Sequence, residues 1–330
     1  MPNHLSTSHK IIVVLGPTAS GKSELAVKIA RKFNGEIISA DSRQVYYGLN
    51  IGSGKVLRDK KIPKSYFYKE IPHHLLDVAS PKRTFTVAQY QKLAKKALKE
   101  IIKRGKIPII CGGTGLYIDA LIYDYQLPNV PPQPKLRKQL EKKLTEELFQ
   151  QLQKLDPRRA KNIDKNNRRR LIRALEIILT TKKPIGILRQ AQDKKSKYDF
   201  LKIGIKKSPE KLKKLITQRL KKRIKQGLIE EVKNLHQPFY SAPAEGEARQ
   251  GRRGKQNLSW KRLDDLGLEY RYISRYLRGL ISKKEMIEIL KKEIWRYTKR
   301  QMTWFKKDKK IHWIESKKIT FKFVKQFLKN

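Results

Sequence analysis

One short segment constrains the fold more than any other part of this chain of 330 residues. The segment GPTASGKS fits the phosphate-binding pattern GxxxxGK[ST] and lies between an apolar run, Ile11 to Leu15, and a helical pattern, Lys22 to Phe33. Its glycines allow backbone N–H groups to face a phosphate, and the following helix adds its positive N-terminal dipole. We expect Lys22 to neutralise phosphate oxygens and Ser23 to hold Mg²⁺. The complete loop is Gly16, Pro17, Thr18, Ala19, Ser20, Gly21, Lys22 and Ser23.

Further strand and helix patterns alternate along the chain. Short apolar strands are predicted at Glu36 to Ser39 and at Ile107 to Cys111, with a helix at Thr86 to Lys103 between them. A later strand is expected at Phe200 to Ile205. Strands that alternate with helices favour a parallel sheet, so the predicted fold class is α/β.

Changes in composition divide the chain into domains. Residues 1–127 are expected to form the first part of the α/β core, and the proline cluster PNVPPQP starts a basic helical insertion over residues 128–190. Residues 191–330 should complete the core, with helical patterns over 209–235 and 283–306. The stretches 189–197 and 240–256 lack core-forming residues, so we expect surface loops there, the second one flexible.

The charge balance points to a polyanionic partner, since 78 Lys and Arg against 30 Asp and Glu give a formal net charge of +48. The single cysteine, Cys111, excludes an intramolecular disulfide and a cysteine-rich zinc site, and its apolar surroundings indicate a strand residue. No apolar stretch approaches the roughly 20 residues of a membrane span, and the first apolar run is too short for a secretory signal. We therefore expect a cytoplasmic protein without a membrane segment.

Two polar segments follow predicted strands and should lie beside the phosphate-binding loop. Asp41 follows the strand at 36–39, and the turn GGTG, with Thr114, follows the strand at 107–111. The Asp41 carboxylate could ligate Mg²⁺, accept a proton from a nucleophile or cap the next turn. A GTPase would carry NKxD and a P-loop motor a further apolar strand ending in Asp, and neither pattern is present. The chain is therefore a poor match to a nucleotide hydrolase.

Seven segments occur in an order that resembles the tRNA dimethylallyltransferase family: GPTASGKS, ISADSRQVYYGLNIGSGK, PHHLLD, FTVAQY, GGTGLY, RRRLIRALE and KRQMTWF. The resemblance extends from about Lys10 to Ile314. It implies a P-loop NTPase-like core with a helical insertion, dimethylallyl diphosphate as donor, Mg²⁺ as cofactor and no nucleoside triphosphate. The family prenylates N6 of adenosine 37, so the implied partner is the tRNA anticodon stem-loop. We expect the protein to be a monomer.

The resemblance also assigns roles within the site. Asp41 occupies the place of the family's catalytic aspartate, which we expect to orient N6 and accept its proton. Arg219 occupies the place of a diphosphate-binding arginine, whereas Arg223 is either a second contact or part of a solvated face. Lys55 matches a family position to which the spacing gives no role. The implied catalytic residues are Asp41, Ser23, Thr114 and Arg219.

The residues expected to bind tRNA come from two regions. Near the site, they are Asp41, Ser42, Arg43, Gln44 and Thr114, with Gln44 at a position that reads the target base. In the helical insertion, they are Arg169, Arg170, Leu171, Ile172 and Arg173. The first and last of these lie four residues apart, on one helix face where they would suit RNA phosphates. Trp295 and Trp304 could either stack on bases or pack in the core.

Some features depart from the family pattern or leave alternatives open. His73 and His74 lack metal-ligand partners at a suitable spacing, so we interpret them as structural. The segment that begins at Gly267 reads GLEY, where many members read GYKE. Three other functions remain: an adenylate isopentenyltransferase that uses free nucleotide, a P-loop small-molecule kinase, and a non-enzymatic RNA-binding protein. The first has no need of a +48 charge, and the last is at odds with an intact phosphate-binding loop.

Overall fold

The computed structural model describes residues 8–59, 66–184, 198–236, 257–315 and 317–329. The chain forms two compact units, one comprising Met1–Ile122 and Ser196–Asn330 and the other Tyr123–Lys195. The predicted surface loops at 189–197 and 240–256 lie outside the described residues. Within the described ranges, no helix has the length and apolar character needed to cross a membrane.

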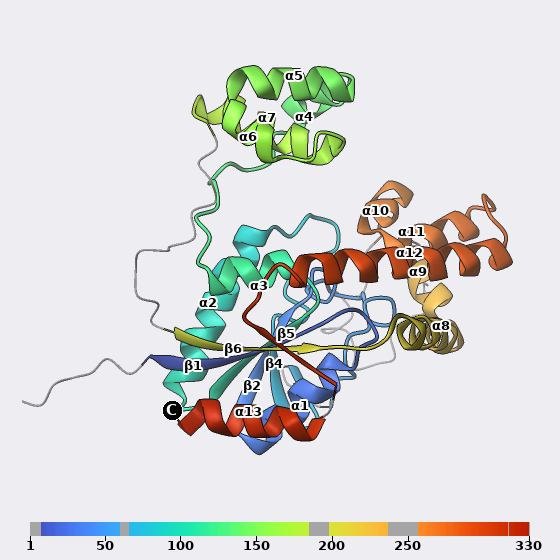
Figure 1. Cartoon of the computed structure of the whole chain (residues 1–330). Coiled ribbons are helices and arrows are strands. Elements are labelled where there is room, and N and C mark those ends of the chain that lie inside the picture. Colours follow the sequence, from blue (N-terminus) through green and yellow to red (C-terminus); the bar gives the residue numbers. More distant parts are fainter. Residues whose placement is uncertain (1–7, 60–65, 185–197, 237–256, 316, 330) are drawn as a thin grey trace, which may run out of the picture. The chain divides into compact units, whose positions relative to one another are not determined.

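A seven-stranded sheet with the order β3-β4-β2-β5-β1-β6-β7 forms the centre of the first unit (Figure 1). Neighbouring strands are parallel except β3 and β4, which are antiparallel. The predicted α/β class is therefore confirmed. The sequence patterns do not predict β3, β4 and β7, because each has only three or four residues. The strands are β1 (His9–Leu15), β2 (Gly35–Ala40), β3 (Tyr66–Tyr68), β4 (Ile71–His74), β5 (Ile107–Gly112), β6 (Tyr198–Ile205) and β7 (Ile311–Ile314).

Strand β1 is buried on both faces because helices cover both sides of the sheet (Figure 1). Its residues Ile11, Val13 and Leu15 pack in one apolar cluster with α2 (Val87–Lys103) and α3 (Gly115–Ile122). Ile12 and Val14 pack in the opposite cluster with α1 (Lys22–Lys32) and α13 (Lys317–Lys329). Successive strand side chains point to opposite faces, so the fully apolar run anchors the start of the phosphate-binding loop in both layers.

A group of helices in the first unit shares a third apolar core with Val45, Tyr46 and Leu49, which follow β2. The helical pattern predicted over 209–235 forms two helices, because Gly227 adopts a φ of 92° that glycine tolerates. Several of these helices lie beyond the end of β6 in Figure 1. They are α8 (Pro209–Lys225), α9 (Leu228–His236), α10 (Trp260–Leu266), α11 (Leu268–Leu277) and α12 (Lys283–Phe305).

The second unit is helical and has an apolar core of its own, which includes Leu148, Leu152, Leu171 and Leu175. Its helices begin at capping residues or prolines, and the Asn167 side chain accepts a hydrogen bond at the start of the last helix. The helices are α4 (Pro134–Leu140), α5 (Thr145–Leu155), α6 (Pro157–Asn162) and α7 (Arg168–Thr181).

Candidate active site

The phosphate-binding loop connects β1 to α1. Gly16 and Gly21 adopt φ angles of 152° and 93°, which let the backbone turn tightly into the helix N-terminus. The Lys22 ammonium donates to the carbonyl of Pro17 over 3.3 Å. Burial lowers the pKa of Lys22, so an anion in the loop would favour its charged form. The buried Ser20 hydroxyl has no partner among the described residues, which leaves it available to a ligand.

The end of β5 lies next to Ser23. The Ser23 hydroxyl shares a hydrogen bond with the Cys111 thiol, and burial raises the pKa of that thiol to about 11, so the thiol stays protonated. The described residues contain no group of three His, Cys, Asp or Glu side chains that could hold a metal. Mg²⁺ prefers oxygen ligands and keeps several waters. A hydroxyl, substrate phosphates and water therefore form a donor set that fits this ion.

Asp41 follows β2 and fixes the turn that comes after it. Its Oδ1 accepts hydrogen bonds from the backbone N–H groups of Arg43 (2.8 Å) and Gln44 (3.3 Å). The capping role left open by the sequence is therefore present. It involves one carboxylate oxygen only, and within the described part of the chain Oδ2 makes no hydrogen bond. The cap thus orients the carboxylate and leaves the second oxygen able to accept a proton.

Thr114 ties the loop after β5 to the loop after β2. Its hydroxyl accepts from the backbone N–H of Ser42 (3.1 Å), its own N–H donates to the carbonyl of Ala40 (3.1 Å), and its side chain shares a hydrogen bond with Tyr297 of α12. A Cβ at Gly112 would lie 2.1 Å from the same Ala40 oxygen, so only glycine allows this approach. The Asp41 turn and the GGTG turn are thereby held as one surface.

Gln301 of α12 joins the GGTG turn to the phosphate-binding loop. Its Oε1 accepts from the N–H of Thr18 (2.9 Å), and its Nε2 donates to the carbonyl of Gly113 (2.8 Å). The side chain is 6% exposed, so both hydrogen bonds are protected from water. Nearby, Trp304 packs against Gly115 and donates to Asp119 over 2.8 Å, which holds α12 in place. Gln301 lies in the segment KRQMTWF, but no pattern in the sequence predicts this bridging role.

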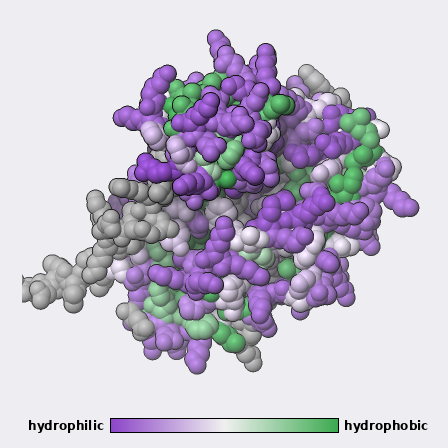
Figure 2. Space-filling model, turned by 45° about the horizontal axis from the view of Figure 1, so that its top comes forward, coloured by the Kyte–Doolittle hydropathy of each residue, from purple (hydrophilic) through white to green (hydrophobic). Residues whose placement is uncertain are grey.

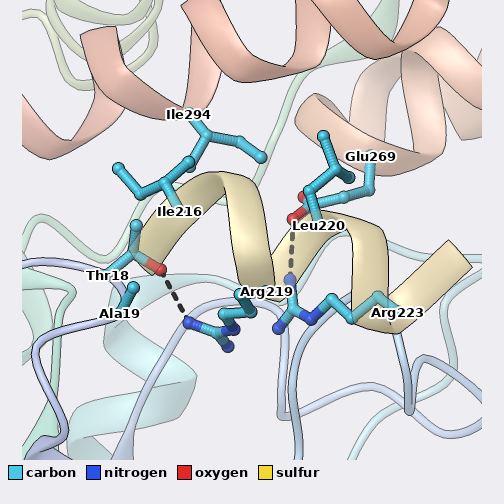
Figure 3. A pocket seen from close by; sticks show the side chains of 8 residues that line it. All are labelled: Thr18, Ala19, Ile216, Arg219, Leu220, Arg223, Glu269 and Ile294. Atoms are coloured by element: carbon cyan, nitrogen blue, oxygen red, sulfur yellow. Dashed lines mark hydrogen bonds and ion pairs between the residues drawn. The ribbon is translucent and has the colours of Figure 1, made fainter. Parts of the chain in front are cut away.

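Two arginines from α8 complete the site (Figure 3). Arg219 Nη1 donates to the Thr18 hydroxyl over 3.0 Å, so the predicted diphosphate-binding arginine contacts the phosphate-binding loop. Arg223 lies one turn further along and donates to Glu269 over 2.8 Å. Burial and the neighbouring Arg223 lower the pKa of Arg219 to about 10, which a bound anion would reverse. The site is therefore cationic around Thr18, with the Asp41 carboxylate at its edge.

Comparison with known proteins places this geometry in a family. The model for IPP transferase matches residues 44–308, and the model for isopentenyl transferase matches residues 9–70. The chain belongs to the IPP transferase family. The resemblance seen in the sequence is therefore confirmed.

Individual members of the IPP transferase family align with nearly the whole chain. The tRNA dimethylallyltransferase of Anoxybacillus flavithermus is 41% identical over 306 residues, which cover 93% of this chain and 90% of the relative. A solved tRNA delta(2)-isopentenylpyrophosphate transferase from Staphylococcus epidermidis is 34% identical, with a TM-score of 0.62. The match covers 97% of this chain and 99% of the solved chain. A solved eukaryotic dimethylallyltransferase acting on tRNA is 27% identical, with a TM-score of 0.62. The match covers 90% of this chain and 70% of the solved chain. These neighbours support a P-loop NTPase-like fold for this IPP transferase.

Several residues matched to the family pattern make hydrogen bonds that shape the loop at 49–55. Gln44 accepts from Ser39 (3.0 Å) and donates to the carbonyl of Gly54 (3.2 Å). Lys55 is buried, donates to the carbonyl of Tyr46 (2.9 Å) and pairs with Asp77, which gives it a structural role. The carboxylate of Glu231 accepts from three successive N–H groups of the same loop, those of Asn50, Ile51 and Gly52.

Arg43 is also held by the protein, since its Nε donates to the carbonyl of Leu266 over 2.6 Å. His73 shares a hydrogen bond with the carbonyl of Ile71, and His74 with Glu36, in keeping with structural roles. Trp295 packs among the third apolar core, and the Lys213 ammonium lies 5.3 Å from its ring centroid.

In the helical unit, α7 divides the predicted tRNA contacts between two environments. Arg169 and Arg170 are exposed. Leu171 and Ile172 are 0% and 7% exposed and belong to the apolar core, so their side chains hold the helix in place. Arg173 pairs with the fully buried Glu176, and it also donates to the carbonyl of Val130 (2.9 Å). The Arg173 side chain is still 37% exposed, so phosphate contacts stay a prediction for all three arginines.

Proposed function

We propose that this protein transfers the dimethylallyl group of dimethylallyl diphosphate to N6 of adenosine 37 in tRNA and releases diphosphate. The observation that carries the proposal is the convergence of Thr18, Asp41 and Thr114 at the carboxyl edge of the sheet. One end of this surface is cationic and suits a diphosphate, and the other end presents a carboxylate that suits an amine. The names of the relatives describe the same activity.

The amine end of the reaction requires a base. An adenine N6 amine is a weak nucleophile because its lone pair is delocalised into the ring. As the N6–carbon bond forms and the bond between the allylic carbon and the diphosphate oxygen breaks, N6 becomes acidic and its proton passes to Asp41. The hydrogen bonds on Oδ1 hold the carboxylate in place, so that Oδ2 can face the amine. The Thr114 hydroxyl maintains the position of this turn.

The diphosphate end of the reaction requires positive charge. Negative charge grows on the departing diphosphate while the allylic carbon becomes cationic. The N–H groups of the phosphate-binding loop, the Lys22 ammonium and the Arg219 guanidinium stabilise that charge. When bound at Ser23, Mg²⁺ would add Lewis-acid stabilisation of the same oxygens.

The tRNA surface requires exposed cations. Hydrophilic side chains cover most of the face shown in Figure 2, as the net charge of +48 predicts. In the helical unit, Arg169 and Arg170 are exposed, and on α12 Lys299 and Arg300 are exposed. We assign each of these two pairs, considered separately, to tRNA phosphates, where each contact releases counterions.

The decisive experiment supplies isotopically labelled dimethylallyl diphosphate together with either tRNA or AMP. Label should enter tRNA and not AMP. Transfer to AMP would favour the adenylate-modifying alternative, and phosphoryl transfer from ATP to a small molecule would favour a kinase. Lys22→Ala should weaken donor binding and turnover but leave tRNA binding intact, whereas Lys28→Ala, at an exposed position of the same helix, should change neither.

A further inference from the structure

The pocket beside the phosphate-binding loop contains a second guanidinium, which the reaction described above does not use. Arg223 is 8% exposed and extends from the same helix face as Arg219. Figure 3 shows both side chains in the pocket lined by Thr18 and Glu269. Cationic side chains are rarely buried unless a partner compensates them, so this position calls for an explanation.

The protein compensates only one end of the Arg223 guanidinium. Nη1 donates to Glu269 Oε1 over 2.8 Å, in an ion pair whose two side chains are each 9% exposed. Nη2 is buried and has no hydrogen-bond partner among the described residues. A buried N–H without a partner is unfavourable, and the remedy is an acceptor that enters the pocket.

The free nitrogen faces a nitrogen of Arg219. A Cβ at Gly54 would lie 1.9 Å from Arg223 Nη2 and 2.0 Å from Arg219 Nη2, so the two nitrogens lie within about 4 Å of each other. Two cations this close repel each other strongly where water is excluded. An anion that accepts from both guanidiniums would turn this repulsion into attraction.

Glu269 sets this geometry. It lies in the first turn of α11 and lines the pocket beside Arg223. Its carboxylate draws Nη1 toward α11 and leaves Nη2 turned toward Gly54. The positive charge beside Gly54 therefore comes from Arg223 of α8.

We propose that Arg223 is a second ligand of the donor's diphosphate, that its Nη2 is the donating atom, and that Glu269 is the positioning residue. The proposal rests on the proposed function, because it places the diphosphate against the phosphate-binding loop, within reach of both arginines. A diphosphate carries oxygens on two phosphorus atoms, so it can accept from two guanidiniums at once.

The test compares variants that all carry Glu269→Gln. Arg223→Met alone would leave the buried Glu269 carboxylate without its partner and could unfold the protein. Glu269→Gln removes that charge, and the amide oxygen can still accept from Arg223 Nη1, so the guanidinium keeps its orientation. Binding of inorganic pyrophosphate to Glu269→Gln and to Arg223→Met/Glu269→Gln is measured by titration calorimetry at one ionic strength. The double variant should bind at least tenfold more weakly. Lys222→Met/Glu269→Gln, which removes an exposed cation of the same helix, should bind within about twofold of Glu269→Gln.

Equal affinity in Glu269→Gln and Arg223→Met/Glu269→Gln would overturn the proposal and make Arg223 a structural ion-pair residue. An equal loss in the Lys222 control would overturn it as well, because the effect would then be general charge. If the methionine variant does not fold, Arg223→Gln in the same background gives the same comparison. Failure of the proposed function is separate: label from dimethylallyl diphosphate would then not enter tRNA, whatever the pyrophosphate affinities of these variants.

Discussion

Replacing Gln301 with methionine tests whether the hydrogen-bonded bridge between two loops matters for the chemistry. Methionine keeps the length and apolar contacts of the side chain and removes its amide. The N–H of Thr18 and the carbonyl of Gly113 then lose their partners at a site that is nearly inaccessible to water. Each unpaired buried group costs about 1–3 kcal/mol, so a loss of stability of about 2–6 kcal/mol is expected for the two groups.

Turnover should fall as well as stability. The bridge sets the distance between the loop that receives the diphosphate and the turn that holds Thr114. A displacement of about 1 Å between reacting groups can cost about 10²-fold in rate, so we expect a loss of that order under single-turnover conditions. The melting temperature should fall by roughly 4–12 °C, which corresponds to about 2 °C per kcal/mol in a protein of this size.

A matched control separates the two effects. Gln91 is also buried and donates to the carbonyl of Ala120 over 2.7 Å, between α2 and α3. Gln91→Met should therefore lower the melting temperature without a comparable loss of turnover. Turnover of Gln301→Met within threefold of wild type, with folded protein, would refute the reasoning. So would an equal loss of activity in Gln91→Met.

Three further predictions concern other parts of the molecule. Asp41→Asn keeps the capped turn but removes the proton acceptor. The single-turnover rate should therefore fall by roughly 10²–10⁴-fold, with little change in tRNA affinity. A rate within a few-fold of wild type would exclude Asp41 as the general base. Arg169→Ala should flatten the slope of log K against log salt for tRNA by up to about one unit, whereas Arg173→Ala should mainly lower the melting temperature, because the buried Glu176 loses a partner. Equal changes of slope in both variants would contradict this division. Burial opposes ionisation of Glu36, but hydrogen bonds from His74 and Arg104 hold its pKa at about 2. This depressed pKa stabilises the fold above the unfolded value near 4.5, and the contribution is lost as pH falls from there toward 2. Glu36→Gln should be less stable at neutral pH and lose less stability across that acid range; identical acid melting curves would rule out the linkage.

The sequence predicts the centre of the site because its signals are local. The glycines and lysine of the phosphate-binding loop, the apolar strand before it and the helix after it lie within one short segment, and backbone geometry alone relates them. Asp41 and Thr114 follow strands for the same reason, and the parallel order of the sheet brings their loops together.

Gln301 and Arg223 could not be assigned in this way. The Thr18 contact of Gln301 spans 283 residues, and no spacing rule relates the two positions. The Arg223–Glu269 pair depends on how α8 and α11 pack, which periodicity does not specify. The helix with Arg169 is different, since its 3.6-residue period already separates exposed arginines from the buried Leu171 and Ile172.

The hydrogen bond between Thr18 and Gln301 also determines when, during synthesis of the chain, the phosphate-binding loop can be held in place. A ribosome adds about 5–20 residues per second, so the phosphate-binding loop is complete roughly 15 to 60 seconds before the glutamine that braces it is made. Strand β7, which closes one edge of the sheet, is made later still. The nascent chain therefore carries an unbraced site until α12 has been made, and catalytic competence is reached only after that helix has packed against the loop.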